Sequence, residues 1–409
     1  MKRLSCLLAV LICLKLAGEP ASAAQNQASP ASKAAVTTVL WPTAGWPKAS
    51  PEAAGVDDKV LTALGEDLPA GKYALVDSFG VYRCGKVVFE RNYSHDYEKI
   101  YAKEAHERGP LNAHLTGWYN YFDPAWHPYY HGTDLHTMQS VTKTVSAIII
   151  GIAMTRGDFK GDLDTLLLDY FDASKVKNVD ERKRRITLRH VLTMTTGLGW
   201  NEEVAYDDPR NDASLMEAGD DWVQYVINRP MAHEPGKVFN YSSGVSELMA
   251  HIFEKETGED IEQYGAKHLF GPLGMEHFWK RSPLGAVDTE GGLFLSNAGL
   301  AKIGYLYLHG GEWEGKRIVS RDWVRQSLAV STEAEEGYRY GFKWWLLPRN
   351  DRQGYIWMAR GFGGQRLMVF PEENLIAVFT GWEILKDEAK DRDLVDRILP
   401  ALRAVACSN

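Results

Sequence analysis

The sequence predicts a mixed α/β (α+β) fold in which both chain ends supply one antiparallel sheet and a mostly helical lobe lies between them. Residues 73–93 have the apolar, β-branched composition of two strands joined by a turn at Cys84-Gly85. Four more strand-like segments lie between residues 339 and 380, whereas helical patterns dominate residues 215–330. Because strands at the two ends need partners, we expect one sheet with helices packed on its faces.

The individual elements follow from periodicity and from turn residues. Residues 141–156 are apolar nearly all round, which predicts a buried helix that ends before Gly157. A second helix is expected at 187–196, and a last one at 391–405. The C-terminal strands are expected at 339–347, 354–358, 365–370 and 375–380, with a turn at 371–374 between the last two.

Composition excludes several classes of protein. The 409 residues are 45% hydrophobic and 24% charged, which is typical of globular proteins and excludes collagen-like, coiled-coil and fully disordered chains. The net charge of −8 disfavours a general nucleic-acid binder, which needs a basic surface. The length allows one large domain or two lobes.

The first residues have the pattern of a secretory signal. Lys2 and Arg3 precede the apolar run Leu7–Leu14, and the small residues Ala21-Ser22-Ala23 follow. This predicts a signal peptide at 1–23 and an exported (periplasmic or secreted) protein, with an uncleaved anchor as the alternative. No later segment is apolar enough to span a membrane, so we expect no membrane association after cleavage.

The remaining chain divides into two parts. Residues 24–50, rich in Ala, Ser, Thr and Pro, are expected to be a flexible lead-in. Residues 51–405 are expected to form a single two-lobed domain, with the helical lobe at roughly 160–330. Cys84 and Cys407 remain after signal cleavage; they could pair in an oxidising compartment or be two unrelated thiols.

The spacing of Ser140 and Lys143 indicates a nucleophile beside a base. Positions three apart share one helix face, so the hydroxyl and the amine can meet at the helix N-terminus. Burial would lower the pKa of Lys143 and allow a neutral amine to take the serine proton. The same spacing occurs at Ser174 and Lys177, but in a charged loop. The alternative is an N-cap serine followed by a surface lysine.

Two further segments contain residues suited to catalysis. Tyr241, beside a lysine, could act as general base and acid, and Ser243 could orient that lysine by a hydrogen bond. In the Gly-rich segment 359–365 the backbone could approach a ligand and supply an oxyanion donor. The alternatives are a packed surface loop for the first segment and a plain β-turn or bulge for the second.

Residues 95–136 are crowded with aromatic side chains and six of the twelve histidines. The aromatic residues could form the wall of an apolar pocket or simply a well-packed long loop. The histidines lack the spacing of metal ligands, so no metal site is expected.

Taken together and in this order, the Ser140, Tyr241 and Gly361 segments resemble the serine β-lactamase and penicillin-recognising family. The resemblance is to the class C-like branch, which includes family VIII esterases and 6-aminohexanoate-dimer hydrolases. Four more segments are typical of that branch: Ile186–Leu198, Phe270–Met275, Gly291–Ser296, and Gly363–Gln365 leading to Val369–Pro371.

The resemblance implies a two-lobed fold and acyl transfer. Ser140 would attack a carbonyl, Lys143 and Tyr241 would manage the protons, and the N–H groups of Ser140 and Phe362 would bind the oxyanion. The expected substrate is a small ester, amide or short peptide-like molecule. No metal or organic cofactor is implied.

Departures from the family pattern favour an ester or amide hydrolase over a β-lactamase or DD-peptidase. β-Lactamases of this branch carry Lys-Thr-Gly where this chain has Ala359-Arg360-Gly361, and Asn where it has Ser243. A non-catalytic binding or sensor protein on the same scaffold is a further alternative. Tyr206 resembles the second tyrosine with which the nylon-oligomer hydrolases hold an amide. An acidic residue of its loop, Glu202, Asp207 or Asp208, would favour a cationic substrate end if it lined the pocket.

Overall fold

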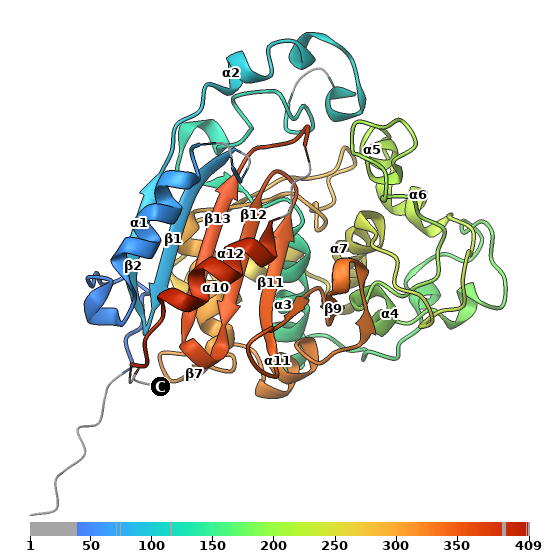
Figure 1. Ribbon diagram of the computed structural model, residues 1–409. Helices are drawn as coiled ribbons and strands as arrows, with labels where there is room; N and C mark the ends of the chain where they lie inside the picture. The colour runs from blue at the N-terminus through green and yellow to red at the C-terminus, as the bar shows by residue number, and fades with distance from the viewer. Residues whose placement is uncertain are drawn as a thin grey trace, which may run out of the picture. The chain divides into compact units, whose positions relative to one another are not determined.

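Eight antiparallel strands from both ends of the chain form one sheet, as the sequence predicts (Figure 1). Their order is β2-β1-β13-β12-β11-β10-β9-β8. The strands span Val76–Arg83 (β1), Lys86–Asn92 (β2), Thr332–Glu333 (β8), Arg339–Tyr340 (β9), Trp345–Pro348 (β10), Tyr355–Gly361 (β11), Gln365–Phe370 (β12) and Leu375–Gly381 (β13). The N-terminal hairpin joins the C-terminal strands through β1 and β13, where Phe79 lies opposite Phe379.

The computed structural model describes residues 39–70, 72–73, 75–114, 117–386, 390–405 and 407. The predicted signal peptide and the first part of the predicted lead-in lie outside these residues. Within the described part of the chain, no helix has both the length and the apolar character needed to cross a membrane.

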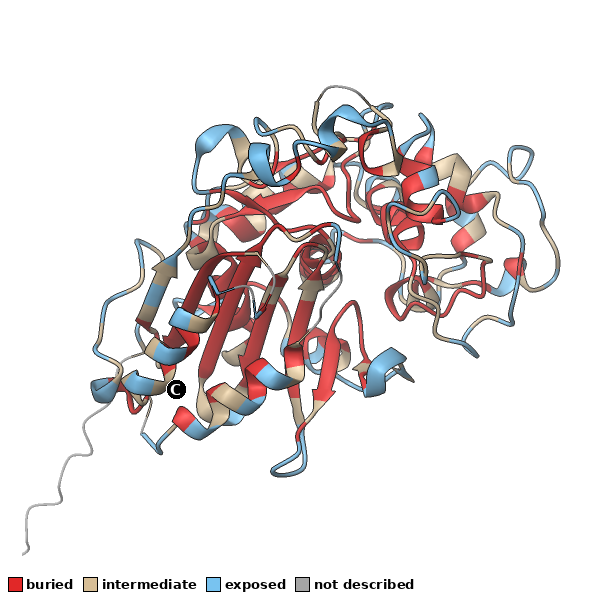
Figure 2. Ribbon diagram, turned by 45° about the horizontal axis from the view of Figure 1, so that its top comes forward, coloured by how far each residue is buried: buried red, intermediate tan, exposed pale blue. Residues whose placement is uncertain are grey.

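Alternating side chains of the central strands pack into two cores, one on each face of the sheet. On β12, Leu367 and Val369 join the core formed with α3 (Val141–Arg156) and α10 (Asn297–Leu308). Met368 and Phe370 face the opposite core, where α1 (Asp58–Asp67) and α12 (Asp391–Ile398) cover the sheet (Figure 1). This alternation follows from the two-residue period of a strand. Figure 2 shows that the middle of the sheet is buried throughout.

A lobe of short helices lies beside the sheet (Figure 1). It contains α4 (Leu188–Leu192), α5 (Asp212–Glu217), α6 (Trp222–Ile227), α7 (Ser243–Thr257), α8 (Ile261–Gly265) and α9 (Gly271–Leu273). This lobe is shorter than the expected 160–330, because α10 packs on the sheet. A Cβ on Gly304 of α10 would meet Val369, Leu367 and Ile376 within 3.3 Å.

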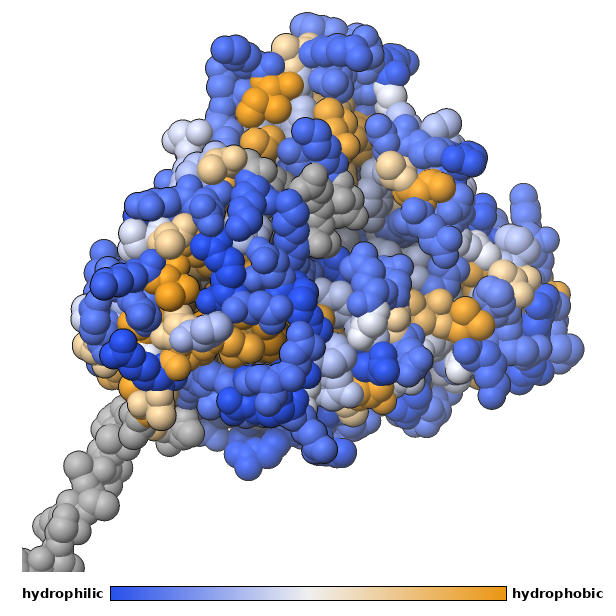
Figure 3. Space-filling view, in the orientation of Figure 1, coloured by the Kyte–Doolittle hydropathy of each residue, from blue (hydrophilic) through white to orange (hydrophobic). Residues whose placement is uncertain are grey.

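Minor elements complete the fold. The short strands β3 (His136–Thr137), β5 (Leu293–Leu295) and β4 (Phe278–Trp279) form a small sheet, and β6 (Glu312–Trp313) pairs with β7 (Lys316–Arg317). The remaining helices are α2 (Tyr97–Ile100) and α11 (Arg321–Ser327). The surface of the face that carries α12 is largely hydrophilic, with scattered apolar side chains (Figure 3).

Several element boundaries differ from the sequence prediction, and the strand expected at 354–358 extends to Gly361. The helix expected at 187–196 ends at Leu192, and Met194 then adopts a positive φ of 58°. The strand expected at 339–347 is interrupted between β9 and β10, where Lys343 also has a positive φ. The last helix ends at Ile398, and a 3₁₀ turn that contains Pro400, which lacks an N–H donor, follows it.

The expectation of a flexible lead-in does not hold for residues 39–50. Trp41 packs against Trp313 with ring centroids 5.3 Å apart, and Trp46 packs against Tyr82 at 4.6 Å. The indole of Trp46 also donates a hydrogen bond to the carbonyl of Ala298. Large aromatic side chains bury enough apolar area to hold the backbone in place.

A disulfide joins Cys84 to Cys407, so the first of the two alternatives for these cysteines applies. It links the turn of the N-terminal hairpin to the end of the chain, 323 residues away in sequence.

Candidate active site

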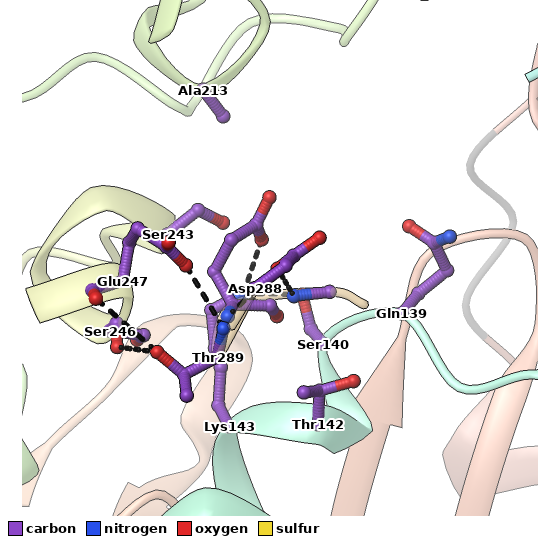
Figure 4. A network of polar contacts seen from close by, with 12 residues as sticks. Gln139, Ser140, Thr142, Lys143, Ala213, Ser243, Ser246, Glu247, Asp288 and Thr289 are labelled. Atoms are coloured by element: carbon purple, nitrogen blue, oxygen red, sulfur yellow. Dashed lines mark hydrogen bonds and ion pairs between the residues drawn. The ribbon is translucent and has the colours of Figure 1, made fainter. Parts of the chain in front are cut away.

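Ser140 lies at the N-terminus of α3, where the close-up of Figure 4 shows it one turn from Lys143. The preceding residue, Gln139, has a positive φ of 47°, which turns the chain sharply into the helix. The Ser140 side chain makes no capping hydrogen bond to the helix backbone. Ser140 occupies the N-cap position without capping the helix through its side chain, and Lys143 is buried. The alternative of a capping serine followed by a surface lysine therefore does not hold, and the hydroxyl remains available for chemistry.

Lys143 is buried, with 2% of its side chain exposed, and its ammonium group is fully hydrogen-bonded. Nζ lies 2.8 Å from Ser140 Oγ, 2.8 Å from the Glu290 carbonyl and 3.1 Å from Glu290 Oε2. An ammonium has three hydrogens, and these three acceptors use all of them. Ser140 Oγ therefore accepts a hydrogen bond from Lys143 and must donate its own hydrogen elsewhere.

The prediction of a neutral amine at Lys143 is wrong. Burial by itself lowers the pKa of Lys143, but the neighbouring Tyr241 oxygen and the carboxylates of Glu290 and Glu202 raise this pKa above its ordinary value. The sequence shows that the helix is buried but not that a distant carboxylate folds against this amine. Lys143 is therefore a cation in the resting site.

Tyr241 lies just before α7, with its ring centroid 5.4 Å from Lys143 Nζ. Burial raises the pKa of Tyr241, whereas the charge of Lys143 and a hydrogen bond from the Ser140 side chain lower it. The ring also packs 5.6 Å from that of Trp345 on β10. The hydrogen that Ser140 cannot direct to Lys143 therefore faces the tyrosine oxygen.

Ser243 does not orient Lys143 as predicted, because its hydrogen bonds go to Glu202. Its Oγ donates to Glu202 Oε1 at 2.6 Å, and its backbone N–H donates to Oε2 at 2.7 Å. Glu202 accepts two more hydrogen bonds, from the Trp200 indole at 2.6 Å and the Tyr206 hydroxyl at 2.7 Å. The sequence places Glu202 in an acidic loop, and only the fold brings its donors together.

Tyr206 and Phe362 line a cavity of about 350 Å³, and Ser140 and Tyr241 line it as well. Their rings lie 4.6 Å apart. Gly361 is required for this arrangement, because a Cβ at this position would lie 2.4 Å from the carbonyl oxygen of Met138. The end of β11 can therefore approach the segment before Ser140 closely. The functional roles of Tyr206, Gly361 and Phe362 remain predictions.

Ala359 and Arg360 point to opposite faces of β11, as expected for neighbours on a strand. Ala359 is fully buried in the core that contains α3. Arg360 lies over the rings of Tyr338 and Trp345, and its Nε is 3.0 Å from the Asp391 carboxylate. Neither residue replaces the lysine that the family's β-lactamases carry at position 359.

The family model for beta-lactamase matches residues 66–397. The chain belongs to the beta-lactamase family. This assignment agrees with the antiparallel sheet, the helical lobe and the position of Ser140 at the end of a buried helix.

The curated relatives that the chain matches include a hydrolase and acyltransferases. The chain is 24% identical to a 6-aminohexanoate-dimer hydrolase of Paenarthrobacter ureafaciens, over 61% of this chain and 67% of that protein. It is 29% identical to a monacolin J acid methylbutanoyltransferase of Aspergillus terreus over 34% of this chain. The second match spans only 36% of the length of that relative.

Solved structures share the fold at low identity. A putative 6-aminohexanoate-dimer hydrolase from Bacillus anthracis has a TM-score of 0.64 and 18% identity, and the match covers 89% of this chain and 88% of that one. A family VIII carboxylesterase has a TM-score of 0.57 and 15% identity, covering 84% of this chain and 97% of that one. The protein is thus a β-lactamase-like serine hydrolase family member with esterase, amidase and acyltransferase relatives.

Sequence reasoning missed a buried group of carboxyl side chains beneath the nucleophile. Its members are Glu217 on α5, Glu247 on α7, and Asp288 and Glu290 on the segment before β5. Figure 4 shows the end of α7 and this segment gathered around Lys143. The nearest sequence signal is Thr289-Glu290, which directly precedes the Gly291–Ser296 segment typical of the family.

The aromatic stretch 95–136 forms a packed loop rather than the main wall of the cavity. None of the residues that the structure describes in this stretch lines the 350 Å³ cavity, although Leu111 and Tyr121 border a small neighbouring hollow at Ser140. Four of its six histidines, His95, His114, His127 and His136, hydrogen-bond to backbone or to Asp77. No described cluster of His, Cys, Asp or Glu side chains could hold a metal. Ser174, which has the same spacing to Lys177, instead donates a hydrogen bond to Asp172 on the surface.

Proposed function

We propose that this family member is an exported serine hydrolase that cleaves an ester or amide through an acyl-enzyme on Ser140. The observation that carries the proposal is the 2.8 Å hydrogen bond from Lys143 Nζ to Ser140 Oγ at the helix N-terminus. A binding protein has no need for a hydroxyl held between a buried ammonium and a tyrosine. The cavity beside Ser140 has room for a small substrate.

The directions of the hydrogen bonds suggest the order of the proton transfers. Ser140 Oγ attacks the carbonyl carbon while its hydrogen passes to the oxygen of Tyr241 in its phenolate form, which the Lys143 cation stabilises. Tyr241 then gives this proton to the departing alcohol or amine as the carbonyl–heteroatom bond breaks. Water hydrolyses the acyl-enzyme by the same route in reverse. The N–H groups of Ser140 and Phe362 are the proposed oxyanion donors.

Ester or amide hydrolysis is favoured over β-lactam hydrolysis or DD-peptidase activity by the residues at the end of β11. The methyl group of Ala359 is buried and cannot bind a carboxylate. The Arg360 guanidinium is already paired with Asp391. A β-lactam carboxylate would therefore lack its usual cationic partner here.

The charges that line the cavity favour a substrate with a cationic end. Seven acidic side chains line it against four basic ones, and two of the basic side chains, Arg360 and Arg366, are paired with Asp391. Glu202 and Asp207 are among the lining residues, whereas Asp208 pairs with Arg210. We expect an aminoacyl ester to react faster than its uncharged analogue, with a difference that shrinks as salt increases.

Export through the N-terminal signal is also part of the proposal. The disulfide between Cys84 and Cys407 supports it, because disulfides persist in oxidising compartments. Fractionation of cells that produce the full chain, with mass measurement of the mature N-terminus, tests it. A cytoplasmic protein that retains residues 1–23 would contradict it.

A substrate panel on matched serine variants tests the catalytic proposal. We expect p-nitrophenyl esters or short linear amides to be turned over, and a fluorophosphonate to label Ser140. Ser140→Ala should abolish both, whereas Ser174→Ala, at the other site with the same spacing, should abolish neither. Faster turnover of nitrocefin than of the p-nitrophenyl esters would favour a β-lactamase. Tight ligand binding with an unreactive Ser140 would favour a binding protein.

A further inference from the structure

Glu290 contacts the lysine beside the nucleophile with both its backbone and its side chain. The carbonyl oxygen accepts one hydrogen bond from Lys143 Nζ at 2.8 Å, and Oε2 accepts another at 3.1 Å. Glu290 is 6% exposed, and Lys143 is 1% exposed. Glu290 therefore accepts two of the three hydrogen bonds that this ammonium can donate, and only the third is left for Ser140 Oγ.

The groups around Glu290 favour its charged form. Burial raises the pKa of Glu290, but Lys143 on α3, a hydrogen bond from Glu217 on α5, and Lys280 after β4 together lower it below its ordinary value. Glu217 has the opposite shift, because burial and the nearby Glu290 raise its pKa well above its usual range. Glu217 is therefore a neutral acid that donates to an ionised Glu290.

Glu202 also raises the pKa of Lys143 through its charge, but its hydrogen bonds go to Trp200, Tyr206 and Ser243. The two buried carboxyl side chains next to Glu290 likewise have partners other than Lys143. Glu247 on α7 accepts a hydrogen bond from the backbone of Thr289 at 2.9 Å, and burial raises its pKa well above normal. Burial raises the pKa of Asp288 to about 6, and its Oδ2 lies 4.0 Å from Lys280 Nζ. Tyr121 donates to Glu217, so its hydroxyl is also occupied.

We infer that Glu290 is a positioning residue for acyl transfer, which holds the Lys143 ammonium so that Ser140 directs its hydrogen to Tyr241. The inference rests on the proposed function. Without the carboxylate, the ammonium loses its fixed charge partner and can rotate or release a proton. The Ser140 hydroxyl could then donate to the amine, and the direction of its hydrogen bond would no longer be defined.

Glu290→Gln tests this role because it removes the charge and keeps the size and one acceptor oxygen. Loss of the carboxylate should let both Lys143 and Tyr241 lose their protons at lower pH, since Glu290 raises the pKa of each. The whole profile of kcat/KM against pH should then move to lower pH by about one unit or more. KM should change less than twofold, and the rate of fluorophosphonate labelling at Ser140 should show the same shift.

Glu247→Gln is the matched control, a second buried glutamate beside the same segment without a contact to Lys143. Because Glu247 is a neutral acid, its amide should leave the pH profile in place. A Glu290→Gln profile that overlays the wild type would overturn the inference, as would an equal shift in both variants. If the wild type shows no activity that depends on Ser140, the proposed function itself fails.

A measurement on the wild type keeps the inference testable if Glu290→Gln does not fold. Selective ¹⁵N labelling of lysine, with assignment by Lys143→Arg, reports the charge of Nζ directly. We expect Lys143 to remain an ammonium beyond the pH at which an exposed lysine titrates. A neutral Lys143 amine near pH 8 would overturn the inference.

Discussion

Lys143 donates three hydrogen bonds, and this count determines where the hydrogen of Ser140 can go. Two bonds reach Glu290 and one reaches Ser140 Oγ, so the serine oxygen is an acceptor toward the lysine. The neighbouring Tyr241 oxygen then becomes the partner for the serine hydrogen. At the scale of single residues, the direction of these hydrogen bonds distinguishes a tyrosine base from the lysine base that spacing alone suggests.

Tyr241→Phe is expected to lower kcat for ester hydrolysis by about 10²–10⁴-fold, because it removes the proton acceptor. The ring should still pack against Trp345, so the melting temperature should change little. Tyr340→Phe is the control, since Tyr340 is also buried against Trp345 and should retain activity. A Tyr241→Phe variant that is as active as Tyr340→Phe and the wild type would exclude Tyr241 as the base.

The pH dependence of the wild type follows from the two pKa shifts. Burial raises the pKa of Tyr241, so its reactive phenolate is a minor species at neutral pH. Lys143 keeps its proton to higher pH than an ordinary lysine, because its acidic neighbours raise its pKa. We expect kcat/KM for an ester, corrected for spontaneous hydrolysis, to rise continuously from about pH 6 to pH 9. A plateau that begins near pH 6.5 would contradict this assignment.

At the scale of elements, α3 depends on a close contact with α11. A Cβ on Gly151 would lie 2.3 Å from two atoms of the Trp323 indole, which is buried and rigid. Gly151→Ala should therefore lower the free energy of unfolding by about 1–3 kcal/mol, although alanine favours helices. Urea unfolding measures this change. Gly219→Ala, where the nearest atom is 3.4 Å away, should have little effect.

Helix α12 is attached to the sheet through the buried carboxylate of Asp391. Arg360 and Arg366 lie 3.0 and 2.6 Å from its oxygens, and the Tyr338 hydroxyl donates to it at 2.8 Å. Asp391→Ala leaves both arginines without this partner, so we expect a loss of about 3–5 kcal/mol in the free energy of unfolding. Asp396→Ala, an exposed position on the same helix, should change it by less than about 0.5 kcal/mol.

The contribution of Asp391 should also depend on pH. Burial alone would raise its pKa, but Arg366 and Arg360 hold the pKa below 3.8. Because the folded-state pKa is lowered, the stabilisation is present at neutral pH and is lost as pH falls through that value. The difference in unfolding free energy between wild type and Asp391→Ala should therefore narrow in acid. A constant difference down to about pH 2 would contradict the ion-pair explanation.

At the scale of the whole molecule, the candidate site is assembled from both lobes. Ser140 and Lys143 come from a helix behind the sheet, Tyr241 and Glu202 from the helical lobe, and Phe362 from the end of a strand. The Cys84–Cys407 disulfide lies elsewhere, where it joins the first hairpin to the chain end.

Removal of the disulfide should change stability but not catalysis. The double variant Cys84→Ser/Cys407→Ser should lower the free energy of unfolding by about 2–5 kcal/mol, because the long loop between the cysteines becomes free in the unfolded chain. The kcat/KM of the folded protein for an ester should match the wild type. Comparison of oxidised and reduced wild type by urea unfolding gives an independent measure. An unchanged midpoint would contradict the expected stabilisation.

Local sequence determined the elements and the proposed nucleophile. Periodicity and turn residues predict α3, the first hairpin and most C-terminal strands, because these signals depend on neighbours within a few residues. The Ser140–Lys143 pair is visible for the same reason, since one helical turn brings the two side chains together. The lead-in is a failure of this reasoning, because composition does not show that Trp41 and Trp46 have partners more than 30 residues away.

Only the tertiary structure decided the charge state of the site. Glu290 lies 147 residues from Lys143 in sequence, and Ser243 lies 41 residues from Glu202. No local pattern reveals these contacts, so the sequence suggested a neutral Lys143 amine that Ser243 would orient. Electrostatic energy depends on distance and burial in the folded chain, and both depend on how segments remote in sequence pack together.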